Sequence, residues 1–175
     1  FFVGPTISSV SLNAANSELT VTFSENVDNT NGGSGDLEVA DFALSISGGA
    51  ATVNATPGSI TKTAQNIWVL GVTITGTANG GETLTVVPAS TAIYSAAGRA
   101  ASTSQSNNTA SLTEKVLPTI SSVSLNAANT ELTVTFSENV YDTDGGSGDL
   151  EAADFALSKS NGVATVASTP TGINK

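Results

Sequence analysis

The sequence predicts an all-β protein, on the evidence of its composition, its short alternating segments and an internal repeat. Of the 175 residues, 39% are apolar and 11% are charged, and the remainder is largely Thr, Ser, Asn and Gly. Thr and Val suit pleated strands, whereas Lys and Glu, which favour helices, are scarce. Turn residues separate short segments in which apolar and polar residues alternate, as they do in half-buried strands.

A long internal repeat divides the chain. Residues 5–62 align without gaps on residues 118–175, and 45 of these 58 positions are identical. The period of 113 residues suits a complete domain and is too long for one unit of a solenoid. We therefore expect a complete module over 1–113, a short linker over 114–118, and the first half of a second module over 119–175.

Seven segments of the first module are predicted strands: 7–12, 18–23, 42–47, 51–56, 67–75, 82–87 and 108–113. In 18–23, the side chains of Leu19, Val21 and Phe23 share one face, and Trp68 begins a second inward row in 67–75. Seven short strands with no amphipathic helix predict a two-sheet sandwich of immunoglobulin-like type. Only residues 90–102 suggest a helical turn.

The second module ends before any counterpart of 67–75. Half of a sandwich leaves its inward side chains and one strand edge exposed. We therefore expect a segment of a longer repeat protein. The alternative is that a neighbouring chain supplies the missing strands by strand exchange.

The charge balance and residue types exclude several classes of function. A net charge of −10 with only five basic residues argues against nucleic acid and anionic membranes as partners. The chain has no Cys and no His, which excludes thiolate metal sites and the common serine and cysteine mechanisms of catalysis. No apolar stretch is long enough to span a membrane. We expect no enzyme.

Acidic residues are concentrated in two windows, 25–41 and 138–154, which hold eleven of the fifteen and contain no Lys or Arg. Two carboxylates about 6 Å apart repel by roughly 3 kcal/mol at an effective dielectric of 20. A bound cation relieves this repulsion, and oxygen ligands without His or Cys point to Ca²⁺. The candidate ligands are Glu25, Asp28, Asn29, Asn31, Asp36, Glu38 and Asp41 in the first module and Glu138, Asp142, Asp144, Asp149, Glu151 and Asp154 in the second.

Strand parity places Glu25 and Glu138 on the inward rows of their strands, where no base is nearby. The second module carries Asp at two positions where the first has Asn, so we expect tighter binding in the second. The alternative is a solvated loop in which Asp41 and Asp154 cap a short turn. Extracellular calcium modules bind at about 10⁻⁴–10⁻³ M, which suits a structural ion.

Four stretches, VTFSENV, GGSGDLEAADFALS, ETLTV and AIYSAAGRAASTSQSNNT, together resemble the immunoglobulin-like tandem repeats of very large bacterial cell-surface adhesins. The resemblance spans the first module and all of the visible second. It implies an exported protein at the bacterial cell surface, a sandwich fold, and a spacer or adhesive role beside neighbouring repeats of the same chain.

Three functions follow from these observations. The leading one is a calcium-stiffened structural repeat in an extracellular stalk or filament. The second is a module that binds glycan or another cell-surface polymer, although the single Trp, Trp68, fits the core better than an exposed platform. The third is a self-assembling filament subunit that other copies complete by strand exchange.

Overall fold

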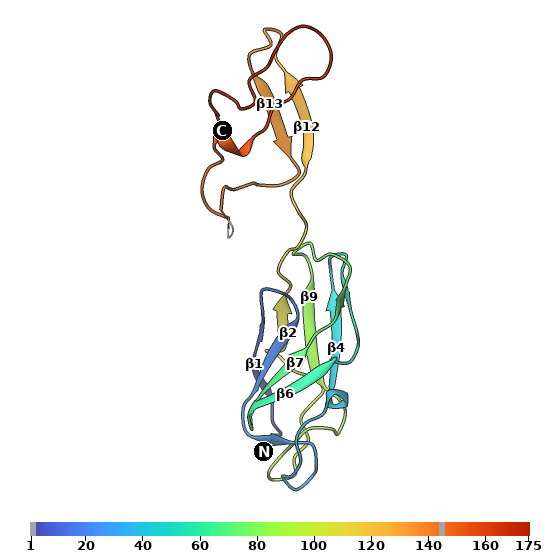
Figure 1. Cartoon of the computed structure of the whole chain (residues 1–175). Coiled ribbons are helices and arrows are strands. Elements are labelled where there is room, and N and C mark those ends of the chain that lie inside the picture. The colour runs from blue at the N-terminus through green and yellow to red at the C-terminus, as the bar shows by residue number, and fades with distance from the viewer. Residues whose placement is uncertain (1–2, 144–145) are drawn as a thin grey trace. The chain divides into compact units, whose positions relative to one another are not determined.

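The computed structural model describes residues 3–143 and 146–175, and the chain divides into two compact units (Figure 1). Unit 1 spans Phe1–Val116 and unit 2 spans Leu117–Lys175. The division lies inside the segment 114–118 that the sequence marks as a linker. In the described ranges the only helical elements are two single 3₁₀ turns, η1 (Val39–Asp41) and η2 (Ala152–Asp154). No helix there is both long and apolar enough to cross a membrane.

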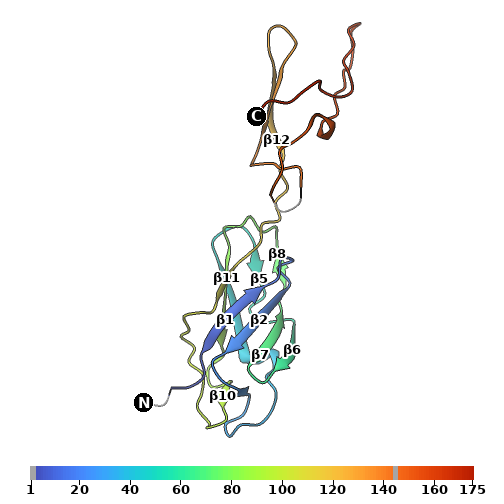
Figure 2. The same ribbon diagram turned by 90° about the vertical axis from the view of Figure 1, so that its left-hand side faces the viewer.

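The first sheet of unit 1 has four antiparallel strands (Figures 1 and 2). Their order is β1 (Ile7–Leu12), β2 (Glu18–Phe23), β7 (Ile67–Gly71) and β6 (Ser59–Ala64). β2 therefore lies in the interior of the sheet, with hydrogen-bonded neighbours on both edges.

The second sheet has three antiparallel strands in the order β11 (Thr109–Ser111), β9 (Thr83–Pro88) and β4 (Phe42–Ser47). Two short ribbons complete unit 1: β3 (Val27–Asp28) with β10 (Tyr94–Ser95), and β5 (Thr52–Val53) with β8 (Ile74–Thr75). The all-β prediction is confirmed, in the form of several small antiparallel sheets.

Both larger sheets contribute side chains to one hydrophobic core. Leu19, Val21 and Phe23 are buried on one face of β2, as their alternation predicts. The ring of Phe23 lies 6.2 Å from that of Phe42 in β4, so the core joins the two sheets. Trp68 is 1% exposed and belongs to this core, as its row predicts.

The structure corrects several strand boundaries. The predicted strand 67–75 is divided into β7 and β8, and only two residues of the predicted strand 51–56 form β5. Sequence patterns missed β3, β6 and β10, because two-residue strands and a Thr- and Lys-bearing edge strand lack a clear apolar alternation. The helical turn suggested for 90–102 is wrong: the backbone of Tyr94 instead pairs with Asp28 and Ala100.

Unit 2 contains one hairpin, formed by β12 (Ile120–Leu125) and β13 (Leu132–Phe136). These strands repeat the sequences of β1 and β2 and pair in the equivalent register. Residues 155–160 repeat most of β4 but form no strand. Residues 117–175 contain no repeat of β7 or β9, the strands that flank β2 and β4 in unit 1.

Candidate functional site

The glycine-rich part of each acidic window forms a small loop closed by its own hydrogen bonds. In unit 1 these bonds join Thr30 to Ser34, and the Asn29 N–H donates to the carbonyl of Gly35 at 3.3 Å. Gly35 adopts φ 90°, and a side chain there would collide with the Asn29 amide, so the position requires glycine. In unit 2, Thr143 and Ser147 make the same bridge. The loops thus hold their shape through Thr and Ser hydroxyls.

A basic side chain reaches each window from a distant part of the chain. Lys62 Nζ lies 2.6 Å from Asp36 Oδ1, and Lys175 Nζ lies 2.7 Å from Asp149 Oδ1. The hydrogen bond and charge of Lys175 lower the pKa of Asp149. Each lysine lies outside its window, 26 residues further along the chain than its aspartate.

Asp41 and Asp154 cap the short 3₁₀ turns. Asp41 Oδ2 accepts the Glu38 N–H at 2.7 Å, and Asp154 Oδ2 accepts the Glu151 N–H at 2.7 Å. Partial burial raises the pKa of Asp41; the Glu38 N–H opposes this effect, and the Glu38 charge adds to it. These hydrogen bonds confirm the capping role that the sequence offered as the alternative to metal ligation.

The parity argument for Glu25 is wrong. β2 ends at Phe23, the chain bends over the next residues, Glu25 is exposed, and Val27 takes the next buried position. Strand alternation stops where the strand stops. Glu138, the copy of Glu25, is half-buried.

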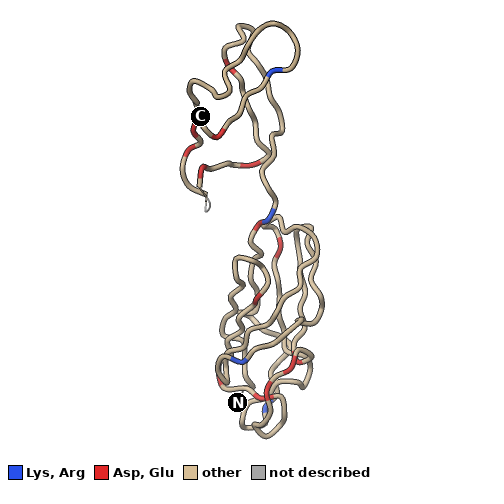
Figure 3. The backbone as a smooth tube through the Cα atoms, viewed as in Figure 1, with Lys and Arg blue, Asp and Glu red and all other residues tan. Residues whose placement is uncertain are grey.

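The remaining predicted ligands lie in different surroundings. Asp28 is buried and accepts a hydrogen bond from Gln65 Nε2 at 2.9 Å, whereas Asn29, Asn31, Glu38, Asp142 and Glu151 are partly or fully exposed. Asp144 lies outside the described residues. Figure 3 shows the acids of window 25–41 at the end of unit 1 that also holds the N-terminus.

The described acidic side chains are spread out rather than clustered. No group of three or more Asp or Glu side chains that could hold a metal ion is found within residues 3–143 and 146–175. Asp36 and Asp149 are paired with lysines, and Asp41 and Asp154 bind backbone N–H groups. Calcium binding therefore stays a prediction from the sequence.

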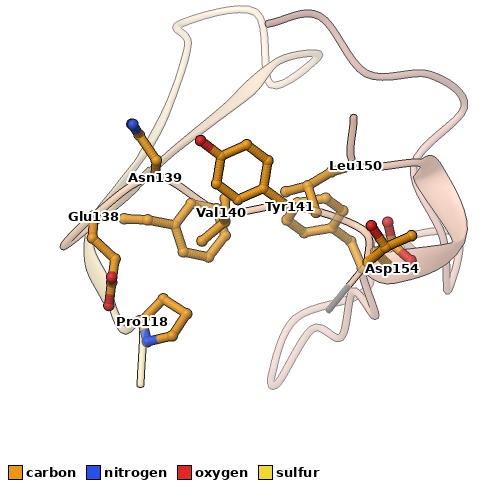
Figure 4. A pocket seen from close by; sticks show the side chains of 10 residues that line it. Pro118, Glu138, Asn139, Val140, Tyr141, Leu150 and Asp154 are labelled. Atoms are coloured by element: carbon orange, nitrogen blue, oxygen red, sulfur yellow. The ribbon is translucent and has the colours of Figure 1, made fainter. Parts of the chain in front are cut away.

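Unit 2 contains an open cavity of about 370 Å³ (Figure 4). Its apolar lining includes four side chains that repeat core residues of unit 1: Phe136, Val140, Leu150 and Phe155. Their counterparts Phe23, Val27, Leu37 and Phe42 are 0–3% exposed. Glu138 lies beside Pro118 on one side of the cavity, and Asp154 lies on the other (Figure 4). The cavity thus exposes apolar side chains whose counterparts are buried in unit 1.

A buried carboxylate that sequence patterns missed holds two loops of unit 1 together. The carboxylate of Glu82 accepts the N–H groups of Ala50, Ala51 and Asn79 at 2.9–3.2 Å. These backbone donors, that of Ala51 first, lower the pKa of Glu82 against the opposing effect of burial. Gly49 packs against it so closely that a Cβ there would collide with the carboxyl group. The position of Glu82 directly after an Asn-Gly-Gly turn is the signal in the sequence.

A buried amide makes a second set of hydrogen bonds between segments that are far apart in the sequence. Asn16 adopts φ 59° in the β1–β2 turn, and its side chain exchanges two hydrogen bonds with the backbone of Thr113, at 2.7 and 2.8 Å. Its copy Asn129 has φ 57° and is exposed. The hydrogen bonds of Glu82 and those of Asn16 stabilise the fold and carry no catalytic chemistry.

Comparison with known proteins gives little further identification. No family model and no curated protein matches the chain. A solved structure, the N-terminal part of the bacterial S-layer protein SbsC, is similar with a TM-score of 0.42 and 23% identity. The match covers 71% of this chain and 26% of that chain, so this chain spans about a quarter of its length. A likeness of this degree assigns neither a family nor a function.

Proposed function

We propose that this chain is a non-enzymatic structural repeat of a bacterial cell-surface protein, in which immunoglobulin-like modules act as spacers of an extracellular stalk or filament. The observation that carries the proposal is the duplication: 45 of 58 aligned residues are identical, and in unit 1 they build part of a complete two-sheet core. The surface location rests on the resemblance of four sequence stretches to adhesin repeats.

The geometry favours a spacer over a glycan-binding module. Recognition of sugars commonly uses exposed aromatic faces, but Trp68 is in the core. Within the described ranges, Tyr141 is the only aromatic side chain that is largely exposed. A single tyrosine does not make a platform.

The open half-core of unit 2 supports self-assembly as a second function. Its unpaired strand and apolar cavity can take a strand from another chain, and joining successive copies in this way builds a filament. This function and the spacer role are compatible, because a filament of repeats also serves as a spacer.

Force spectroscopy on tandem arrays of residues 5–117 tests the spacer role. Each module should unfold in one event that releases about 400 Å of chain, since 113 residues extend by at most 3.6 Å each. Regular steps in proportion to the number of modules support the proposal. Irregular steps contradict it, and saturable binding of the full chain on a glycan array favours the glycan-binding alternative.

A calcium site in the window 138–154 is retained as a proposal. An ion there requires Asp149 to leave Lys175, so the lysine competes with the metal. At tenfold excess over its dissociation constant, calcium should stabilise a module by about 1.4 kcal/mol. Calorimetric titration of the full chain and of Lys175→Ala with calcium tests this, and the variant should bind more tightly. If neither protein shows a heat of calcium binding, the proposal is wrong.

A further inference from the structure

The glycine-rich loop of unit 1 carries an asparagine directly before a glycine. The chain contains three such pairs: Asn31–Gly32, Asn79–Gly80 and Asn161–Gly162. The side-chain amide of an asparagine can react with the backbone nitrogen of the next residue. Glycine permits this reaction best, because it has no Cβ to obstruct the approach and its backbone is the least restricted. The surroundings of each pair in the folded chain therefore determine how fast it reacts.

The Asn31–Gly32 pair lies exposed at the tip of its loop, between the bridged residues Thr30 and Ser34. Among the described residues, none makes a hydrogen bond with the Asn31 side chain or with the Gly32 N–H. A Cβ on Gly32 would meet no other atom within 4 Å. The amide of Asn31 is thus open to water and is not held away from the nitrogen that follows it.

The two atoms that must join face the same neighbour. A Cβ built on Gly98 would lie 3.3 Å from Asn31 Cγ and 3.8 Å from the backbone nitrogen of Gly32. Gly98 has φ 74° and lies in the turn that follows β10, so the loop tip packs against bare backbone. The amide carbon and the attacking nitrogen therefore lie on the same side of the loop.

The Asn79–Gly80 pair has the same two residues but is held by hydrogen bonds. Asn79 Oδ1 accepts the Gly81 N–H at 3.0 Å, which closes a local turn. The Asn79 N–H donates to the buried carboxylate of Glu82 at 3.0 and 3.2 Å. Turning the Asn79 amide toward the Gly80 nitrogen breaks the first bond, and moving the backbone breaks the second. Asn79 should therefore react slowly while unit 1 is folded.

The second copy of the loop already has a carboxylate at the position of Asn31. Its counterpart in the sequence is Asp144, and the bridge between Thr143 and Ser147 still closes that loop. Window 25–41 has five acidic residues and window 138–154 has six. Conversion of Asn31 to aspartate gives the two windows the same number of acids, with a residue that the repeat already uses there.

We propose that Asn31 is a site of spontaneous deamidation, through which unit 1 gains one negative charge at its loop tip as the protein ages. The Gly32 nitrogen loses its proton and attacks Asn31 Cγ, and the amide nitrogen leaves as ammonia to give a cyclic succinimide. Water then opens the ring at the side-chain carbonyl to give aspartate, or at the backbone carbonyl to give isoaspartate. The net reaction consumes one water and releases one ammonium ion, so it needs no enzyme, oxidant or cofactor. The inference does not depend on the proposed repeat function.

Incubation of the full chain in neutral buffer, followed by trypsin digestion and mass spectrometry, tests the site. Cleavage after Lys and Arg places each Asn–Gly pair in a separate peptide: 1–62, 63–99 and 160–175. Asn31 should gain the mass of an amide-to-acid conversion at least about tenfold faster than Asn79, a difference that the two hydrogen bonds of Asn79 can produce. Fragmentation should place the added mass on residue 31. Asn31→Gln should remove it from peptide 1–62, because glutamine closes a ring much less readily.

The matched control is the same incubation in guanidinium chloride, which removes the hydrogen bonds of Asn79 without changing the sequence. Emission from Trp68, the only Trp of the chain, reports that unit 1 is folded in buffer and unfolded in the denaturant. The rates at Asn31 and Asn79 should then agree within about twofold, since the unfolded chain leaves both pairs free.

Three outcomes overturn the proposal. The first is an equal rate at Asn31 and Asn79 in the folded chain. The second is a mass gain in peptide 1–62 that persists in Asn31→Gln. The third is an unchanged preference for Asn31 in guanidinium chloride, which would assign the difference to the flanking sequence and not to the fold.

Discussion

Units 1 and 2 place nearly the same 58 residues in different surroundings, and the outcome separates local from long-range determinants of structure. The β1–β2 hairpin and its copy have the same pairing, and the glycine-rich loop and the 3₁₀ turn of unit 1 each have a counterpart in unit 2. The copy of β4 is no strand, and the copy of Leu19 is exposed. Hairpins and turns are thus encoded locally, whereas burial and the second sheet require partner strands.

Truncation of a core leucine should give the largest difference between the units. Leu19→Ala leaves a cavity beside Leu70 and should destabilise unit 1 by about 2–5 kcal/mol. Leu132→Ala removes a side chain that is already exposed and should cost less than about 0.5 kcal/mol. Scanning calorimetry of the full chain measures both. Equal costs would show that unit 2 has a closed core.

Loss of the hydrogen bonds between the Asn16 amide and the backbone of Thr113 should have the next largest effect on stability. Asn16→Gly keeps the positive φ without strain but leaves the backbone groups of Thr113 without their partner, at a cost of about 1–3 kcal/mol. Asn129→Gly is the matched control and should be near neutral. Urea unfolding followed by Trp68 emission, together with calorimetry, measures the two. If Asn16→Gly leaves the free energy of unfolding unchanged, the hydrogen bonds of Asn16 are not important for stability.

Glu82 should make unit 1 sensitive to acid. Its folded-state pKa lies below the ordinary value of 4.5, so its stabilising effect is complete above that pH and is lost as pH falls through the folded-state pKa. Urea unfolding between pH 3 and 7 should show a smaller decline in Glu82→Gln than in the wild type. The exposed Glu114→Gln is the charge-matched control and should keep the wild-type decline. Parallel curves for wild type and Glu82→Gln would exclude this role.

The two lysine–aspartate pairs should give the smallest effects. Asp36→Asn and Asp149→Asn each remove one exposed ion pair, which is worth about 0–1 kcal/mol at low salt and less at high salt. Because the same pair occurs in both units, the two changes should be alike. Unfolding at low and high salt tests this, and a cost that high salt does not reduce would point to another role for these carboxylates.

The sequence predicted the strands that carry clear alternation and the core position of Trp68, because both depend on local pattern. It did not predict the Lys62–Asp36 pair or the hydrogen bonds from the N–H groups of Ala50 and Ala51 to Glu82, because these partners are 26 to 32 residues apart. Glu25 was misplaced because alternation was extended past the end of β2. Pairing distances and strand ends are set by the tertiary fold, and a pattern within one segment does not contain them.

The equivalence of the β2 and β13 edges gives the order of synthesis a role in correct folding. β7 is complete 61 residues before Leu132 is made, an interval of about 3–12 s at common translation rates. Hairpins form within microseconds, so during synthesis β7 meets only β2. Refolding from denaturant presents both edges at once. Chains that emerge from a ribosome should therefore misassemble less often than chains diluted out of urea.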